Sequence, residues 1–139
     1  MATENKWRGL EGNSYRLENL GRPAIFLLPV WKLKAKLGKT TIEQDLHRFL
    51  ITQFGAYTST TIPSFGVWKN TKKAIVSDEC RQYEVSFNGK ERIPLLAGKL
   101  AEIARLIEED CVYLKAGQYS CLVYPLQIQK PHKKPKQRN

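Results

Sequence analysis

The spacing of the hydrophobic residues changes several times along this chain, and the order of these spacings restricts the possible folds more than any other feature of the sequence. Apolar residues alternate with polar ones at 31–37 and again at 83–87, as in half-buried strands. At 42–54 and 96–107 they recur every three or four residues, as on one face of a helix. Helical segments therefore separate strand segments, which favours an α+β domain.

The first strand is expected at 23–37. It starts with the apolar run 24–31, which is typical of a buried strand, and ends in strict alternation. In the alternating part Lys32, Lys34 and Lys36 fall on one face, so that successive ammonium groups lie about 6.5 to 7 Å apart. This spacing is close to that of phosphates along one nucleic-acid strand and predicts a contact with a polyanion. The same lysines would also suit a face that is simply solvated.

A helix is predicted at about 41–54. Thr40 and Glu43 have the spacing of a capping box, in which the threonine side chain accepts from the backbone of Glu43. Gly55 follows the last apolar position, as glycine does after many helices. His47 falls on the polar face and is expected to be an exposed histidine without a catalytic partner.

The second half of the chain repeats the pattern. Pro63 and Gly66 suit an edge strand at 64–69, and a turn is expected at 70–77. A half-buried strand at 83–87 ends at Asn88 and Gly89. A second helix is predicted at 93–109, and an apolar strand at 119–124.

The predicted order of elements is β-α-β-β-α-β. We therefore expect a ferredoxin-like two-layer sandwich, in which two helices cover one face of a four-stranded antiparallel sheet. The domain is expected at 23–128, after an irregular N-terminal arm at 1–22 and before a disordered basic tail at 129–139. In this fold the first and third strands are central, so the lysines of the first strand would share the open face with Gln82, Glu84 and Ser86.

Two short segments resemble RNA-recognition-motif domains, which have the same order of elements. Residues 25–27 (Ile-Phe-Leu) loosely resemble the first-strand motif of that family, and residues 81–87 loosely resemble its third-strand motif. The resemblance concerns architecture. Placing Tyr83 and Val85 on the open face, where that family stacks bases, would drive Gln82 and Glu84 into the core.

The charge of the chain is its clearest functional indication. Lys and Arg total 23 against 13 acidic residues, a net charge of +10, and the last ten residues contain five basic residues and no acidic one. Flexible cationic segments bind polyanions without sequence preference. The sequence therefore predicts a nucleic-acid-binding surface on the first strand and its turn, an edge loop and the tail, made of Lys32, Lys34, Lys36, Lys39, Trp68, Lys69, Lys72, Lys73, Lys130, Lys133, Lys134, Lys136 and Arg138.

Other classes of function find less support in the sequence. It has no P-loop, dinucleotide fingerprint or nucleophile elbow, so we expect a protein that is not an enzyme and needs no cofactor. Cys80, Cys111 and Cys121 lack metal-ligand spacing and are expected to be buried thiols, with no metal. No apolar run reaches the roughly 18 residues of a membrane span, and no leader is evident, so a cytoplasmic location is expected.

The expected partner is RNA or DNA. The alternative is a protein-interaction or inhibitor module whose basic surface engages an acidic protein, with an edge strand available for homodimer formation.

Overall fold

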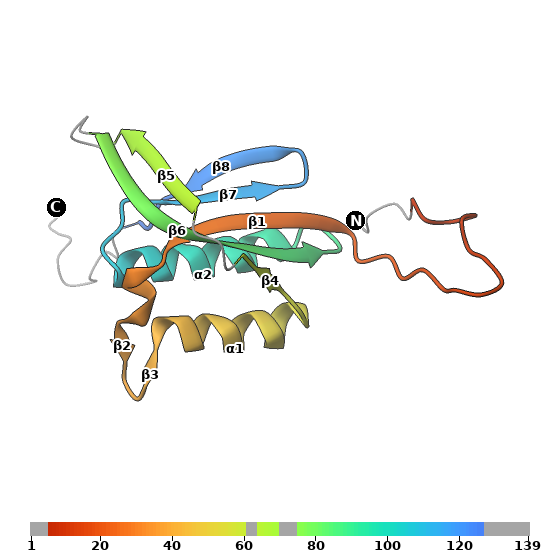
Figure 1. Cartoon of the computed structure of the whole chain (residues 1–139), viewed down its shortest axis with the longest axis horizontal. Helices are drawn as coiled ribbons and strands as arrows, with labels where there is room; N and C mark the ends of the chain where they lie inside the picture. Colours follow the sequence, from red (N-terminus) through yellow and green to blue (C-terminus); the bar gives the residue numbers. More distant parts are fainter. Residues whose placement is uncertain (1–5, 61–63, 70–74, 127–139) are drawn as a thin grey trace, which may run out of the picture.

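The computed structural model describes residues 6–60, 64–69 and 75–126. These residues form an antiparallel sheet and two helices, α1 (Ile42–Phe54) and α2 (Arg92–Leu106). Both helices lie on the same side of the sheet (Figure 1). The predicted two-layer α+β sandwich is therefore confirmed.

The sheet has more strands than expected. Among the described residues the main sheet has six strands, and β1 and β6 are central neighbours in it, as predicted. A short strand at 64–69, also predicted, pairs with the first half of β6. The expected sheet had four strands, whereas this sheet has six. The ferredoxin-like assignment therefore stays a prediction. In sheet order the strands are β4 (Thr58–Ser59), β6 (Ile75–Phe87), β1 (Arg22–Pro29), β7 (Val112–Ala116) and β8 (Tyr119–Val123), with β5 (Ser64–Lys69) beside β6.

The core lies between the sheet and the helices. Alternate residues of β1 and β6 are buried, as strand geometry requires, and Phe26 stacks on Tyr83 with ring centres 5.2 Å apart. Each large side chain that is fully buried stabilises the fold by about 1.5 to 3 kcal/mol. Because Tyr83 and Val85 belong to this core, they do not form a base-stacking surface. The helices contribute Ile42, Leu46, Leu50, Leu96, Leu100, Ile103 and Ala104.

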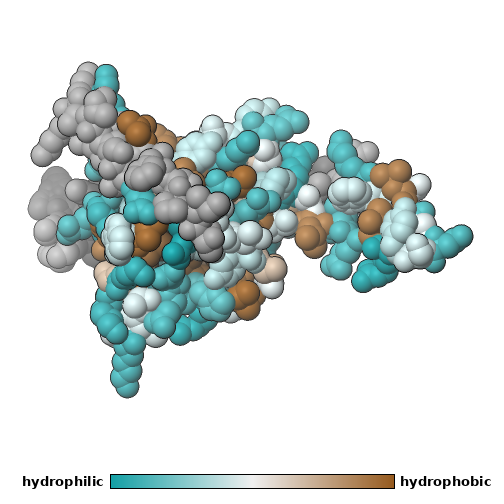
Figure 2. Space-filling view, in the orientation of Figure 1, coloured by the Kyte–Doolittle hydropathy of each residue, from teal (hydrophilic) through white to brown (hydrophobic). Residues whose placement is uncertain are grey.

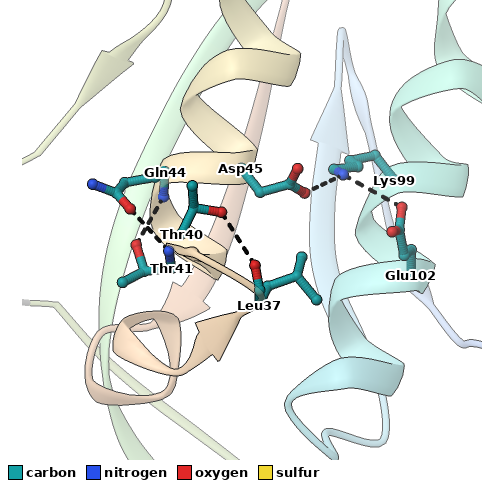
Figure 3. Close-up of polar contacts among 7 residues, drawn as sticks. All are labelled: Leu37, Thr40, Thr41, Gln44, Asp45, Lys99 and Glu102. Atoms are coloured by element: carbon teal, nitrogen blue, oxygen red, sulfur yellow. Dashed lines mark hydrogen bonds and ion pairs between the residues drawn. The ribbon is translucent and has the colours of Figure 1, made fainter.

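Helix α1 begins one residue later than the sequence pattern indicated. The capping residue is Thr41, whose hydroxyl accepts from the Gln44 backbone at 3.1 Å while the Gln44 side chain accepts from the Thr41 backbone at 2.9 Å (Figure 3). Thr40 instead donates its hydroxyl to the Leu37 carbonyl. Two adjacent threonines each have a polar residue three positions on, so spacing alone did not identify the cap. Gly55 ends the helix in the left-handed conformation, as predicted.

A polar contact links the two helices. The ammonium group of Lys99 lies 2.6 Å from Asp45 of α1 and 3.4 Å from Glu102 of α2 (Figure 3). It also lies 5.4 Å from the ring centre of Phe49, and its side chain is only 11% exposed. The charge is therefore paired where it is removed from water, which avoids the cost of an isolated buried ion.

The long first strand predicted at 23–37 is wrong in its second half. Strand β1 ends at Pro29, Val30 has helical backbone angles, and a 3-10 helix covers Trp31–Lys34. The alternation resembled a strand because Leu33 inserts into the core, leaving Trp31 and the neighbouring lysines outside. A small hairpin of β2 (Lys36–Leu37) and β3 (Thr40–Thr41) then leads into α1.

The C-terminal half also differs from expectation. Helix α2 ends at Leu106, and a strand that the sequence pattern did not reveal, β7, lies beside β1. The strand predicted at 119–124 is the outer member of a hairpin with β7, so Tyr119 and Leu122 are exposed instead of buried. Cys80 is buried, Cys111 is half-buried and Cys121 is exposed, so the expectation of buried thiols holds only for the first.

The N-terminal arm extends away from the domain (Figure 1). Residues 6–21 contain no strand, and Tyr15 bonds within the arm, donating its hydroxyl to the Leu10 carbonyl at 2.6 Å. Hydrophobic patches are visible on its surface (Figure 2). Trp7 and Leu10 of the arm are both about half exposed. The predicted tail at 129–139 lies outside the described residues.

Candidate functional site

A cavity of about 410 Å³ opens where α1 ends and α2 begins, beside β4 and the last residues of β6. Its volume falls within the range of small-molecule sites, roughly 300 to 1,000 Å³. The wall mixes apolar and polar groups, as ligand sites do. Its lining residues are Asn19, Leu20, Gln53, Phe54, Ala56, Tyr57, Thr58, Glu84, Val85, Ser86, Phe87, Asn88 and Arg92.

Arg92 is held at one wall of this cavity by two contacts. Its guanidinium donates to the Gln53 carbonyl at the end of α1, and its central carbon lies 4.9 Å from the centre of the Phe54 ring. The carbonyl end of a helix attracts cations, and an arginine above an aromatic face gains a cation–π contact. A guanidinium has five N–H donors, so Arg92 keeps donors for an anionic ligand group.

Glu84 provides the opposite charge. It is exposed on β6, where it lies opposite Thr58 of β4 and Ile25 of β1. Among the described lining residues, Glu84 and Arg92 are those that carry full charges, and they have opposite signs. By strand alternation the Glu84 side chain points to the sheet face away from the helices, whereas Arg92 begins α2 on the helix side, so the two charges border the cavity from opposite faces of the sheet.

Tyr57 connects the cavity to helix α1. Its hydroxyl lies 2.8 Å from Nδ1 of His47, and its ring centre lies 5.9 Å from that of Tyr83. His47 is exposed, as expected, and its contact with Tyr57 is one that the sequence did not indicate. Contacts on two sides therefore fix the Tyr57 ring as a wall of the cavity. His47 also lines a second hollow of about 300 Å³ on the outer side of α1.

A polar chain continues behind Tyr57. Arg81 of β6 makes an ion pair with Glu43 of α1 and a hydrogen bond with the Tyr83 hydroxyl. Burial raises the pKa of Tyr83 above its ordinary value, and the nearby Arg81 guanidinium partly offsets that rise. Tyr83 thus stays protonated at neutral pH, and its hydroxyl accepts from Arg81, whose ion pair with Glu43 joins β6 to α1.

The residues expected to bind nucleic acid do not gather at this site. Lys32 and Lys34 lie in the 3-10 helix, Lys36 in β2 and Lys39 in the turn before β3, so the predicted row of lysines on one strand face does not exist. Lys32 is paired with Glu109. Lys69 is exposed at the end of β5. The side chain of Trp68, and all of Lys72, Lys73, Lys130, Lys133, Lys134, Lys136 and Arg138, lie outside what the structure describes.

The sequence did not identify the cavity because its wall comes from distant parts of the chain. Tyr57 follows a helix-ending glycine, Ser86 sits on a strand, and Arg92 starts α2. Each has an ordinary sequence context. The one indication of the cavity in the sequence was the pair of opposite charges at Glu84 and Arg92, on adjacent elements. Their separation along the chain does not predict that they border the same cavity.

The described residues show neither a metal-binding cluster nor a membrane-spanning helix. The described part of the chain holds no group of three or more His, Cys, Asp or Glu side chains placed to bind a metal. Neither α1 nor α2 has the length and apolar composition that crossing a membrane requires.

Comparison with known proteins identifies similarity at the level of fold. No protein-family model matches the chain, and no curated protein does. Among solved structures, a phage SAM lyase in complex with S-methyl-5′-thioadenosine is similar with a TM-score of 0.55 and 13% sequence identity, over 81% of this chain and 96% of that one. A phage SAM lyase in the apo state gives a TM-score of 0.48 and 14% identity, over 83% of this chain and 100% of that one.

This likeness corrects the functional expectation drawn from charge. The similar solved protein is named as a lyase, and its complex holds S-methyl-5′-thioadenosine. A non-enzymatic nucleic-acid-binding protein is therefore not the reading that the fold favours. The same correction applies to the alternative of an acidic protein partner or a homodimer formed through an edge strand. A positive net charge favours non-specific association with polyanions, but it does not predict whether the fold contains a ligand-binding cavity.

Proposed function

We propose that this protein is an enzyme that binds S-adenosylmethionine in the cavity between α1, α2 and β6 and cleaves it. The observation that carries the proposal is the likeness to the phage SAM lyase, which spans 96% of that chain. Fold alone does not determine function. The cavity adds independent support, since its volume suits a nucleoside and its wall carries aromatic rings and two opposite charges.

The chemistry follows from the bond that must break. Releasing S-methyl-5′-thioadenosine breaks the bond between the sulfonium sulfur and the γ-carbon of the methionine part. The electron pair goes to sulfur, which becomes a neutral thioether. In a reaction without water the γ-carbon is satisfied within the four-carbon fragment, either by attack of its own carboxylate oxygen or by loss of a proton to form a double bond. The protein's task in both routes is to hold one reactive conformation.

The charges of the cavity have different tasks in this reaction. Positive charge leaves the sulfur in the transition state, so a carboxylate beside the sulfur would stabilise the substrate more than the transition state. Glu84 is therefore assigned to the ammonium group or the ribose hydroxyls. Arg92, held by Gln53 and Phe54, is assigned to the substrate carboxylate, which its remaining donors can orient.

The test is product formation by the purified full chain. S-adenosylmethionine is incubated with the protein, and S-methyl-5′-thioadenosine and the four-carbon product are followed by liquid chromatography and mass spectrometry. A lactone and an unsaturated amino acid are isomers separated by chromatography, whereas a hydrolysis product is heavier by one water. The proposal fails if S-methyl-5′-thioadenosine forms no faster than in buffer alone and if calorimetry detects no binding of S-methyl-5′-thioadenosine to the protein.

Two matched variants locate the activity. Ala56 lines the cavity and is exposed, so Ala56→Trp fills the site and should lower the rate at least tenfold. Ala35 is also exposed but lies in the segment between the 3-10 helix and β2, so Ala35→Trp should leave the rate within about twofold. Equal loss in both variants would place the chemistry elsewhere.

A further inference from the structure

One edge of β6 lacks a neighbouring strand where it passes the cavity. Strand β4 pairs with β6 through Thr58 and Glu84, whereas β6 continues to Phe87. Extending this register places Ala56 opposite Ser86. No backbone hydrogen bond between these two residues is found in the part of the chain that the structure describes, since the chain at Ala56 has just left α1. Ala56 and Ser86 both line the cavity.

The direction of the peptide groups of Ser86 follows from the register. In antiparallel sheets the N–H and C=O of one residue point to the same side, and the side alternates along the strand. Val30 donates its N–H to the Glu79 carbonyl, so odd-numbered residues of β6 bond toward β1. Thr60 donates to the Gln82 carbonyl, so even-numbered residues bond toward β4. The peptide groups of Ser86 therefore face the edge where β4 has ended.

The pairing on the other edge of β6, toward β1, agrees with this direction of the Ser86 peptide groups. The residue of β1 that faces Ser86 is Pro23, which has no N–H to offer. Ser86 thus makes no ladder bonds with β1 and presents one donor and one acceptor side by side to the cavity. Backbone groups removed from water need partners.

We propose that these peptide groups bind the adenine of the substrate. The Ser86 N–H donates to ring nitrogen N1, and the Ser86 C=O accepts from the exocyclic amine, a pairing that adenine's adjacent acceptor and donor allow. The inference rests on the proposed function and adds which part of the substrate meets which part of the cavity. A base in the plane of the sheet at this edge has Phe54 and Tyr57 on its helix side, and aromatic rings stack on bases.

A peptide strand is the other ligand that pairs with sheet edges. The open part of this edge is short, because pairing with β4 resumes at Glu84 and β6 ends at Phe87. Only the peptide groups of one residue are therefore available between the two, whereas strand addition uses a row of alternate residues. A single flat heterocycle fits this opening.

The decisive test compares two ligands on the unaltered full chain. S-methyl-5′-thioadenosine and its 6-oxo analogue, S-methyl-5′-thioinosine, differ in the base: the amine donor becomes a carbonyl acceptor, and N1 becomes a donor. In the 6-oxo base, the N1–H would face the Ser86 N–H, and the carbonyl oxygen would face the Ser86 C=O. By titration calorimetry the inosine compound should bind at least about tenfold more weakly, the ratio expected when a site's polar groups lose their partners.

The outcomes separate the two proposals. Equal affinities for the two compounds would overturn adenine recognition by Ser86 and leave the proposed function standing. Binding of neither compound would overturn both.

A pair of variants then tests Ser86 itself. Ser86→Pro removes the N–H, which does not face β1, and should weaken binding of S-methyl-5′-thioadenosine about tenfold. Ser86→Ala keeps both peptide groups and should bind within about twofold of the native chain. A large loss in the alanine variant would assign the contact to the hydroxyl and overturn the inference. Should the proline variant not fold, the comparison of the two ligands still decides.

Discussion

Gly21 lies where the N-terminal arm passes the end of β6. Its φ is +90°, and a β-carbon added there would lie 2.0 Å from the carbonyl oxygen of Phe87. Both the backbone angle and the space therefore require glycine. The next residue starts β1, and the two preceding ones, Asn19 and Leu20, line the cavity.

Gly21→Ala should therefore destabilise the protein by more than a left-handed alanine alone costs. The expected loss is about 3 kcal/mol or more, since strain and a backbone clash add. Gly38→Ala is the matched control, because Gly38 also has a positive φ of +68° but has nothing within 4 Å of the added carbon. Its loss should be only about 1 to 2 kcal/mol. Urea unfolding measures both, and equal losses would contradict the proposed clash.

Tyr83 makes stability depend on pH at the alkaline end. Burial raises its pKa above the ordinary value of 10.0, so the folded state holds the phenol proton more tightly than the unfolded chain does. Its contribution is therefore fully present below pH 10.0 and is lost as the pH rises above that value. Stability should fall in this window. Tyr83→Phe should flatten the fall, which thermal unfolding between neutral and alkaline pH would reveal; an unchanged slope would contradict it.

At the scale of the elements, the start of α1 is a test of the observed cap. Thr41→Ala removes the acceptor for the Gln44 backbone and should cost about 1 kcal/mol of unfolding free energy. Thr40→Ala removes only the hydroxyl bond to the Leu37 carbonyl and should cost less. Urea unfolding of the two variants ranks them, and the reverse order would favour the cap that the spacing first indicated.

The elements show which patterns a sequence reveals and which it does not. The apolar stripes of α1 and α2 were sufficient to predict both helices, and the glycine after α1 was sufficient to predict where that helix ends. Helix periodicity and a left-handed helix end are local properties of the sequence. The 3-10 helix at Trp31–Lys34 was mistaken for a strand, because one buried residue between exposed ones has the same short pattern in both structures. Strand β7 was missed because its five residues looked like a connection before Gly117.

The site was beyond sequence reasoning for a different reason. Its two charges, Glu84 and Arg92, belong to consecutive elements that meet only when α2 packs on the sheet. Excess lysine, the most visible feature of the composition, instead suggested a row of lysines along one strand, which the described residues do not form. The edge at Ser86 depends on where a neighbouring strand stops, and no residue type marks that point.

At the scale of the whole molecule, the arm and the domain are expected to be energetically separate. None of residues 6–20 belongs to the core. The guanidinium of Arg16 lies 3.9 Å from the carboxylate of Glu18, so this ion pair is internal to the arm. Deleting residues 1–17 should therefore change the free energy of unfolding by no more than about 0.5 kcal/mol. Chemical unfolding of the shortened and full chains makes the comparison. A larger loss would show that the arm packs on the domain and would contradict the predicted boundary.

The length of one connection governs access to the candidate site. Ala56 and Tyr57 are the residues between the glycine that ends α1 and the first residue of β4. Because they depart from the sheet toward the helix, pairing stops two residues short of Ser86. A related chain with one or two more residues in this connection would be free to continue the ladder, occupying by its own backbone the position that a ligand takes here. Insertion or deletion at this point, more than substitution of any side chain, would thus decide whether a protein of this fold keeps an open pocket.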